Sequence, residues 1–192
     1  MAHRHVSLFI PLVLASACGG SSQPAASPGD SASSGTEANT SAGNDTPAYE
    51  KARTEVVRLS AEAEKNPLLA PWTGPYGGVP PWDKLKLEGI PGAFTTGIAL
   101  LLAEVDVIAN NPQLPTFENT LAALEDSGRP QHRAEILFSV LTSNLNTPEV
   151  QAVDREWSPK LSAAYDAITF NEKLFKRISA VYAARQSALT PE

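Results

Sequence analysis

The sequence has very little of the chemistry on which thiol or metal catalysis depends. Its 192 residues include one cysteine, Cys18, and three histidines, at positions 3, 5 and 132. A single cysteine excludes an intramolecular disulfide and any zinc site built from several thiolates. Positive charge is not in excess either, because the net charge is −6 and the pI is about 5.1. Nucleic acid is therefore not an expected partner, since proteins that bind it present a basic face.

The histidine that remains beyond the N-terminal segment, His132, has no second histidine near it. A zinc-hydrolase helix carries two histidines four residues apart and a glutamate that serves as general base. The letters QHRAE supply only His132 and Glu135, three residues apart. The glycine cluster at 74–78 also lacks the spacing of a phosphate-binding loop. We therefore expect no catalytic residue, no metal ligand and no cofactor site in this chain.

The first 18 residues, MAHRHVSLFIPLVLASAC, resemble a bacterial lipoprotein signal. Their apolar segment, 6–14, is too short to span a bilayer, which takes about 20 apolar residues. We predict that Cys18 is lipidated and anchors the chain to a membrane of the bacterial cell envelope. Gly19 is not the aspartate of an inner-membrane retention signal, which favours the outer membrane or its periplasmic face. Ordinary cleavage after Ala17 is the alternative, because Ala15 stands where such signals usually carry leucine.

Residues 19–46 contain no leucine, isoleucine, valine or aromatic residue. Such a stretch cannot bury enough apolar surface to offset the entropy lost on ordering. We predict a disordered linker, rich in serine, glycine and alanine, that tethers a folded domain to the anchor.

From residue 47 onward, apolar residues recur every three or four positions, which predicts helices. We expect an N-terminal helix over 47–66 and an all-α, antiparallel bundle over 67–192, with about six helices in all. Pro159 falls inside one helix and should kink or interrupt it. The expected inward residues of the later helices are Ile90, Phe94, Ile98, Leu101, Leu102, Val105 and Ile108; Phe117, Thr120, Leu121 and Leu124; Ile136, Leu137, Val140 and Leu141; Val150, Val153, Trp157, Leu161, Tyr165 and Ile168; and Leu174, Phe175, Ile178, Val181 and Tyr182.

One segment, 67–89, breaks the helical pattern with five prolines and four glycines. Its leucines and aromatic residues favour burial, so we predict an extended stretch packed on the domain. The alternative is a contact surface for peptide or protein, made by Trp72, Tyr76 and Trp82.

Three stretches resemble the N-terminal region of the thimet oligopeptidase family, zinc metallopeptidases that include peptidyl-dipeptidase and oligopeptidase A. They are PPWDKLKLEGIPGAF at 80–94, IANNPQLPTFENTLAALEDSG at 108–128 and LTSNLNTPEVQAVDREWSPKLSA at 141–163. The most specific match is PTFENT, from Pro115 to Thr120. The similarity extends over about 66–192.

This resemblance implies a neurolysin-like N-terminal helical region that lines one side of a deep channel. The complete enzymes use zinc to cleave short peptides. Their H-E-x-x-H helix has no match here, so no catalytic or metal residue is transferred. We predict that this chain is the incomplete N-terminal part of such an enzyme and is inactive alone.

Two other functions stay open. The chain could be a stand-alone, lipid-anchored helical module that binds peptide or protein. It could also be one half of a split enzyme whose zinc half is a separate chain. The final letters, Thr190-Pro191-Glu192, read as a helix start and favour truncation. In that case apolar residues around 174–182 should be left exposed.

Overall fold

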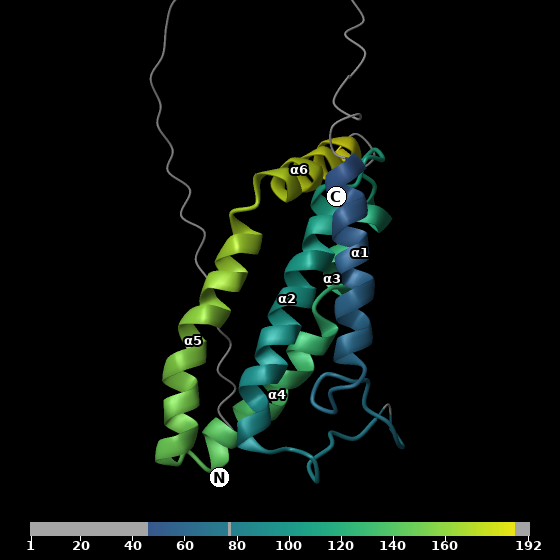
Figure 1. Ribbon diagram of the computed structural model, residues 1–192. Coiled ribbons are helices and arrows are strands. Elements are labelled where there is room, and N and C mark those ends of the chain that lie inside the picture. The colour runs from purple at the N-terminus through teal and green to yellow at the C-terminus, as the bar shows by residue number, and fades with distance from the viewer. Residues whose placement is uncertain (1–45, 77, 187–192) are drawn as a thin grey trace, which may run out of the picture. The chain divides into compact units, whose positions relative to one another are not determined.

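The computed structural model describes residues 46–76 and 78–186, which form a helical unit (Figure 1). No strand occurs within these two ranges, where a lone antiparallel bridge joins Thr73 and Val79. The all-α prediction is confirmed. Cys18, the linker up to residue 45 and the final Thr190-Pro191-Glu192 lie outside the described residues. The elements are α1 (Thr46–Ala63), the 3-10 turn η1 (Leu87–Gly89), α2 (Ile90–Ala109), the π-helical turn η2 (Phe117–Ala122), α3 (Ala123–Asp126), α4 (Arg129–Asn144), α5 (Pro148–Thr169) and α6 (Glu172–Gln186).

Helix α2 lies at the centre and contacts α1, α4, α5 and α6 (Figure 1). A helix that is apolar on nearly every side must be covered on nearly every side. By length and composition alone the stretch Leu87–Ala109 could also span a membrane, but 56% of it is buried inside the protein, as in a core helix. The buried residues of α2 are Ile90, Ala93, Phe94, Thr96, Gly97, Leu100, Leu101, Ala103, Val105, Ile108 and Ala109.

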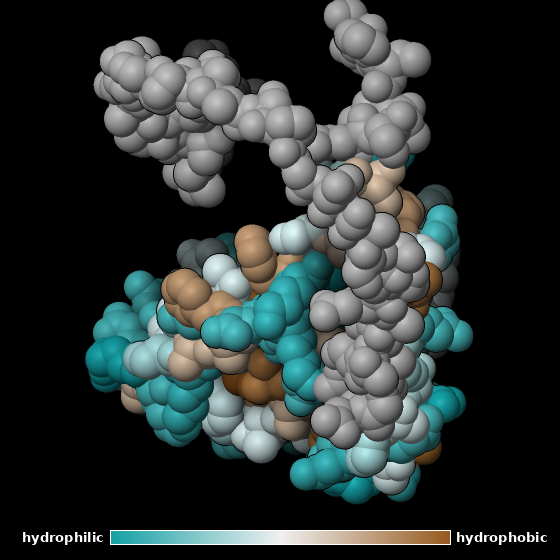
Figure 2. All heavy atoms as spheres, turned by 90° about the horizontal axis from the view of Figure 1, so that it is seen from above, coloured by the Kyte–Doolittle hydropathy of each residue, from teal (hydrophilic) through white to brown (hydrophobic). Residues whose placement is uncertain are grey.

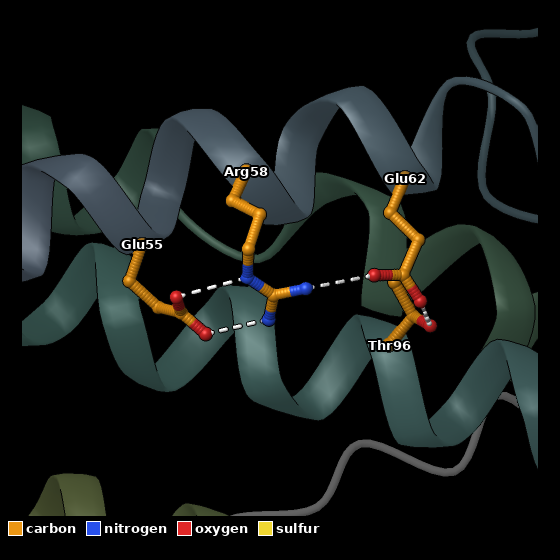
Figure 3. A network of polar contacts seen from close by, with 4 residues as sticks. All are labelled: Glu55, Arg58, Glu62 and Thr96. Atoms are coloured by element: carbon orange, nitrogen blue, oxygen red, sulfur yellow. Dashed lines mark hydrogen bonds and ion pairs between the residues drawn. The ribbon is translucent and has the colours of Figure 1, made fainter.

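A polar network fixes α1 against α2 (Figure 3). Along α1, Arg58 donates to Glu55 at 2.6 and 3.0 Å and to Glu62 at 3.2 Å. From α2, the buried hydroxyl of Thr96 donates to the other oxygen of Glu62 at 2.9 Å. The exposed ion pairs contribute little energy by themselves. Their effect is to hold Glu62 in a position where its carboxylate accepts a hydrogen bond from Thr96. Without this bond the buried hydroxyl of Thr96 would have no partner.

The deepest packing joins α2, α4 and α5 through three aromatic rings. Phe94 is fully buried and meets Phe138 edge-on, with ring centroids 5.4 Å apart. The ring of Trp157 on α5 lies 5.6 Å from Phe94 in a tilted arrangement. Both geometries suit the quadrupoles of aromatic rings. One side chain on α2 therefore connects two later helices.

The inward face of α4 differs from the predicted one. Leu137 is buried as predicted, but Ile136, Val140 and Leu141 are only half-buried, and the other buried residues are Gln131, Ala134 and Phe138. The cause is Gly97 on α2, where an added Cβ would lie 2.2 Å from Oε1 and 3.1 Å from Cα of Gln131. The missing side chain lets α4 approach closely and turns Gln131 toward α2.

Of the predicted kink or interruption at Pro159, the interruption does not occur, because α5 continues through this residue. Proline removes one hydrogen bond, to the carbonyl four residues earlier, at Arg155. Both Pro159 and Arg155 are exposed. Water can therefore hydrate the freed carbonyl, and the lost bond does not end the helix.

Candidate functional site

The segment after α1 is held to the domain by its first residues. Leu68 and Leu69 are buried, as predicted. The side chain of Asn66 accepts the N–H of Leu68 at 3.0 Å, and Nε of Arg133 on α4 donates to the carbonyl of Leu69 at 2.8 Å. Burial is the main cause that lowers the pKa of Arg133, and repulsion from Arg129 adds to it. Arg133 stays cationic nonetheless, because an arginine begins with a very high pKa.

The three aromatic residues predicted as a contact surface have different surroundings. Trp72 is half-buried, whereas Trp82 is 46% exposed and Tyr76 is fully exposed. Tyr76 has a φ of 60°, in the left-handed region that non-glycine residues seldom adopt. Gly78, with a φ of 113°, lies so close to the backbone of Trp72 that a Cβ would be 2.7 Å from its carbonyl oxygen. This turn therefore presents Tyr76 outward and Trp72 inward, so the three residues do not share one exposed face.

The motif PTFENT forms a capped turn that is stabilised by hydrogen bonds between its own residues. The Oγ1 atom of Thr116 accepts the N–H of Asn119 at 3.1 Å, and Oδ1 of Asn119 accepts the N–H of Thr116 at 2.8 Å. This reciprocal pair is a capping box. Asn119 also donates to the carbonyl of Leu114 at 2.9 Å. Phe117 is 45% exposed, so its predicted inward position is wrong.

A buried arginine from α6 closes the same turn, and we call this arrangement the Arg177 clasp. Nη1 of Arg177 donates to the carbonyls of Asn111 and Gln113 at 2.8 and 3.0 Å, and Nη2 donates to Oδ1 of Asn119 at 2.9 Å. Burial is the largest cause that shifts the pKa of Arg177, and it lowers that pKa. The clasp joins the motif to α6, so the role of PTFENT that the geometry shows is structural.

The Arg177 clasp was not predicted from the sequence. A signal was present, since Arg177 interrupts the apolar stripe of α6 between Leu174 and Val181. A charged residue in such a stripe needs partners that satisfy it. The loop carbonyls after Asn110-Asn111-Pro112 were the available acceptors.

Polar groups also gather where α2 meets the turn between α3 and α4. Oε2 of Glu104 accepts the N–H of Gly128 at 2.7 Å, and Gly128 has a left-handed backbone with a φ of 72°. Burial raises the pKa of Glu104, the Gly128 hydrogen bond opposes this shift and Asp126 reinforces it. Asp126 is itself paired with Arg129. Glu104 and Asp126 line a hollow of about 250 Å³.

No metal site is found in the described residues, 46–76 and 78–186. Nowhere in them do three or more histidine, cysteine, aspartate or glutamate residues lie together so that they could hold a metal ion. His132 is exposed on α4.

Both oxygens of Glu135 accept a hydrogen bond from the hydroxyl of Tyr165 at 2.9 Å. Burial, with the hydrogen bond and the charge of Glu135, raises the pKa of Tyr165 to about 12. Tyr165 is 44% exposed, against the inward position predicted for it.

Comparison with known proteins connects this architecture to peptidases. No family model matches the chain. The chain is 36% identical over 122 residues to dipeptidyl carboxypeptidase of Escherichia coli (strain K12), and it is equally similar to the enzyme of the same name from Salmonella typhimurium. The chain is related in sequence to dipeptidyl carboxypeptidases. The matched residues are 64% of this chain but 18% of each relative's length. The chain therefore spans less than a fifth of the relatives it matches.

Proposed function

We propose that the described helices are the N-terminal helical part of a zinc-dependent oligopeptidase of the dipeptidyl carboxypeptidase kind. The observation that carries this proposal is the 36% identity over 122 residues. The Arg177 clasp supports it, because PTFENT, the most specific part of the resemblance, is used here to hold the helices together. The helices would form one wall of the channel that admits short peptides.

The chemistry in this proposal lies outside the chain. Zinc, the general base and the metal ligands would come from the large share of the relatives' length that has no counterpart here. This chain alone would then be inactive. Cys18 would carry a lipid anchor and place the protein at the cell envelope, on the outer membrane or its periplasmic face.

A peptidase assay tests the proposed inactivity. The purified 192-residue protein is incubated with zinc and short blocked peptides, with the Escherichia coli enzyme as positive control. We expect no hydrolysis that a chelator abolishes. Chelator-sensitive hydrolysis by this chain, retained through repeated purification, would contradict the proposal. Co-purification of a separate zinc-binding chain that restores activity would identify a split enzyme.

The second candidate is a stand-alone, lipid-anchored module that binds peptide or protein. The observation that favours it is the exposure of Tyr76 and Trp82. Saturable peptide binding, followed by tryptophan fluorescence and lost in Trp82→Ala, would support it. Trp157 is the matched control fluorophore because it is buried in the core, and its signal should not respond to ligand.

A further inference from the structure

A hollow of about 420 Å³ lies between the end of α1, α2 and the start of α4. Its charged lining residues are Glu64, Glu104, Asp126, Arg129 and Arg133, and we call it the charged hollow. Figure 2, a view from above, shows apolar residues exposed beside hydrophilic ones, which is ordinary for a protein surface. Charge of both signs around one hollow of ligand size is a more specific indication of a binding site.

Four of these charges form a row. Burial raises the pKa of Glu104, and the nearby Asp126 adds to this rise. Asp126 pairs with Arg129. Burial lowers the pKa of Arg133, and repulsion from Arg129, one helical turn earlier on α4, lowers it further. The row therefore begins with the carboxylate of Glu104 and ends with the guanidinium of Arg133, on either side of the inner ion pair.

The two outer groups are half-buried and lack a partner of opposite charge. Within 46–76 and 78–186 no ion pair involves Glu104 or Arg133. Glu104 accepts the N–H of Gly128 through Oε2, and Arg133 donates to the carbonyl of Leu69 through Nε. Oε1 of Glu104 and both Nη nitrogens of Arg133 make no hydrogen bond to the described residues. Withdrawing a charge from water without pairing it costs free energy, and a ligand that carries the opposite charges would offset this cost.

We propose that the charged hollow binds a small zwitterion, with the ligand's ammonium group beside Glu104 and its carboxylate beside Arg133. This goes beyond the proposed function, because it needs neither zinc nor a further chain. The inner ion pair lies between the two outer groups, so the ligand's charges must be several bonds apart, as in an ω-amino acid or a dipeptide. Apolar side chains in the same hollow, those of Leu69 and Leu100 among them, suit the carbon chain between the charges.

A series of matched ligands tests the proposal on the 192-residue chain. The zwitterion ε-aminocaproate carries both charges, caproate lacks the ammonium group and hexylamine lacks the carboxylate. In isothermal titration calorimetry we expect saturable binding of ε-aminocaproate. Each single-charge analogue should bind at least about tenfold more weakly, since it loses a charge-assisted hydrogen bond. Alanyl-alanine is titrated in parallel, and the tighter of the two zwitterions identifies an ω-amino acid or a dipeptide as the ligand class.

Two substitutions test the place of each charge. Glu104→Gln keeps an acceptor for the Gly128 N–H, and it should weaken the binding of ε-aminocaproate and hexylamine at least about tenfold while leaving that of caproate unchanged. Arg133→Gln should weaken the binding of ε-aminocaproate and caproate by a similar factor and leave that of hexylamine unchanged. Glu125→Gln and Arg155→Gln are the controls, because both residues are exposed and neither lines the hollow. A substitution that only disturbed packing would weaken the binding of all three ligands alike.

Three results would overturn the proposal. In the first, neither ε-aminocaproate nor alanyl-alanine binds saturably at millimolar concentration. In the second, the single-charge analogues bind as tightly as the zwitterion. In the third, Glu104→Gln and its control Glu125→Gln bind ε-aminocaproate equally, a comparison that stands even where Arg133→Gln fails to fold because the carbonyl of Leu69 loses its donor. A loss of affinity that follows the removed charge, in ligand and protein alike, supports the proposal.

Discussion

Helix α2 is apolar on nearly every side and is surrounded by other helices, whereas α6 is amphipathic and is covered along one side. Helices α1, α3, α4, α5 and α6 all contact α2, and its largest side chain, Phe94, is fully buried. Helix α6 packs on α2 and η2, and it leaves Phe175 and Tyr182 exposed to 66% and 63%. The difference shows that an apolar helix face predicts burial but does not identify the element that would cover it. For α2 the contact is within the described unit, whereas on the outer side of α6 Phe175 stays exposed within that unit.

The largest expected effect comes from truncating the same residue type in the two regions. Phe94→Ala removes a ring that packs on Phe138 and Trp157, and it leaves a cavity. We expect the free energy of unfolding to fall by about 3–5 kcal/mol. Phe175→Ala should change it by less than about 0.5 kcal/mol, because an exposed ring contributes little to folding. Urea denaturation of the 192-residue chain measures both.

Similar losses in the free energy of unfolding for Phe94→Ala and Phe175→Ala would contradict the difference between α2 and α6. They would mean that the outer side of α6 is packed within the isolated chain.

The next largest effect should come from the Arg177 clasp, which connects the two regions. Arg177→Met keeps the length of the side chain but removes the donors to Asn111, Gln113 and Asn119. We expect a loss of about 2–3 kcal/mol, since three partly buried, charge-assisted hydrogen bonds are lost. Hydrogen exchange should quicken in α6 more than in α2. The control is Lys176→Met at the exposed neighbouring position, and comparable destabilisation in that control would refute a specific role for the clasp.

The ends of the helices follow from local sequence chemistry more directly than their buried faces do. Thr147 caps α5 through the N–H of Val150, and Asn171 caps α6 through the N–H of Leu174. Gly128 has the left-handed backbone expected after a helix. Each depends on neighbours in the chain, so a single sequence is enough to find it.

Burial depends on contacts between distant residues, which periodicity does not report. The position of Gln131 is set by Gly97, 34 residues earlier, and the partners of Arg177 lie about 60 residues before it. The candidate site shows the same limit. Trp72, Tyr76 and Trp82 are close in sequence, yet the backbone of the turn separates the first from the other two in exposure.

A smaller effect should distinguish two glycines on α2 that the sequence does not distinguish. Gly97→Ala would force its Cβ against the Cα and side chain of Gln131, and we expect a loss of about 1–3 kcal/mol. Gly92→Ala meets no atom within 4 Å, so it should stabilise the chain by about 0.4–1 kcal/mol. Thermal melting of both variants measures the contrast. Two stabilising substitutions would show that α2 and α4 are not in close contact at Gly97.

The smallest effect concerns Glu104, the half-buried carboxyl group of α2. Burial raises its folded pKa above the ordinary value of 4.5, so its stabilising contribution is complete below that value and is lost as the pH rises through the folded pKa. Glu104→Gln keeps an acceptor for the Gly128 N–H but removes the charge. We expect this variant to raise the free energy of unfolding by a fraction of a kcal/mol at about pH 7, after solvent screening, and to leave it unchanged at about pH 4. Urea denaturation at both pH values gives the difference from the unsubstituted chain, and Glu125→Gln, at an exposed position on α3, is the control. A difference that shrinks toward neutral pH would mean that the Gly128 hydrogen bond outweighs burial in setting the folded pKa of Glu104.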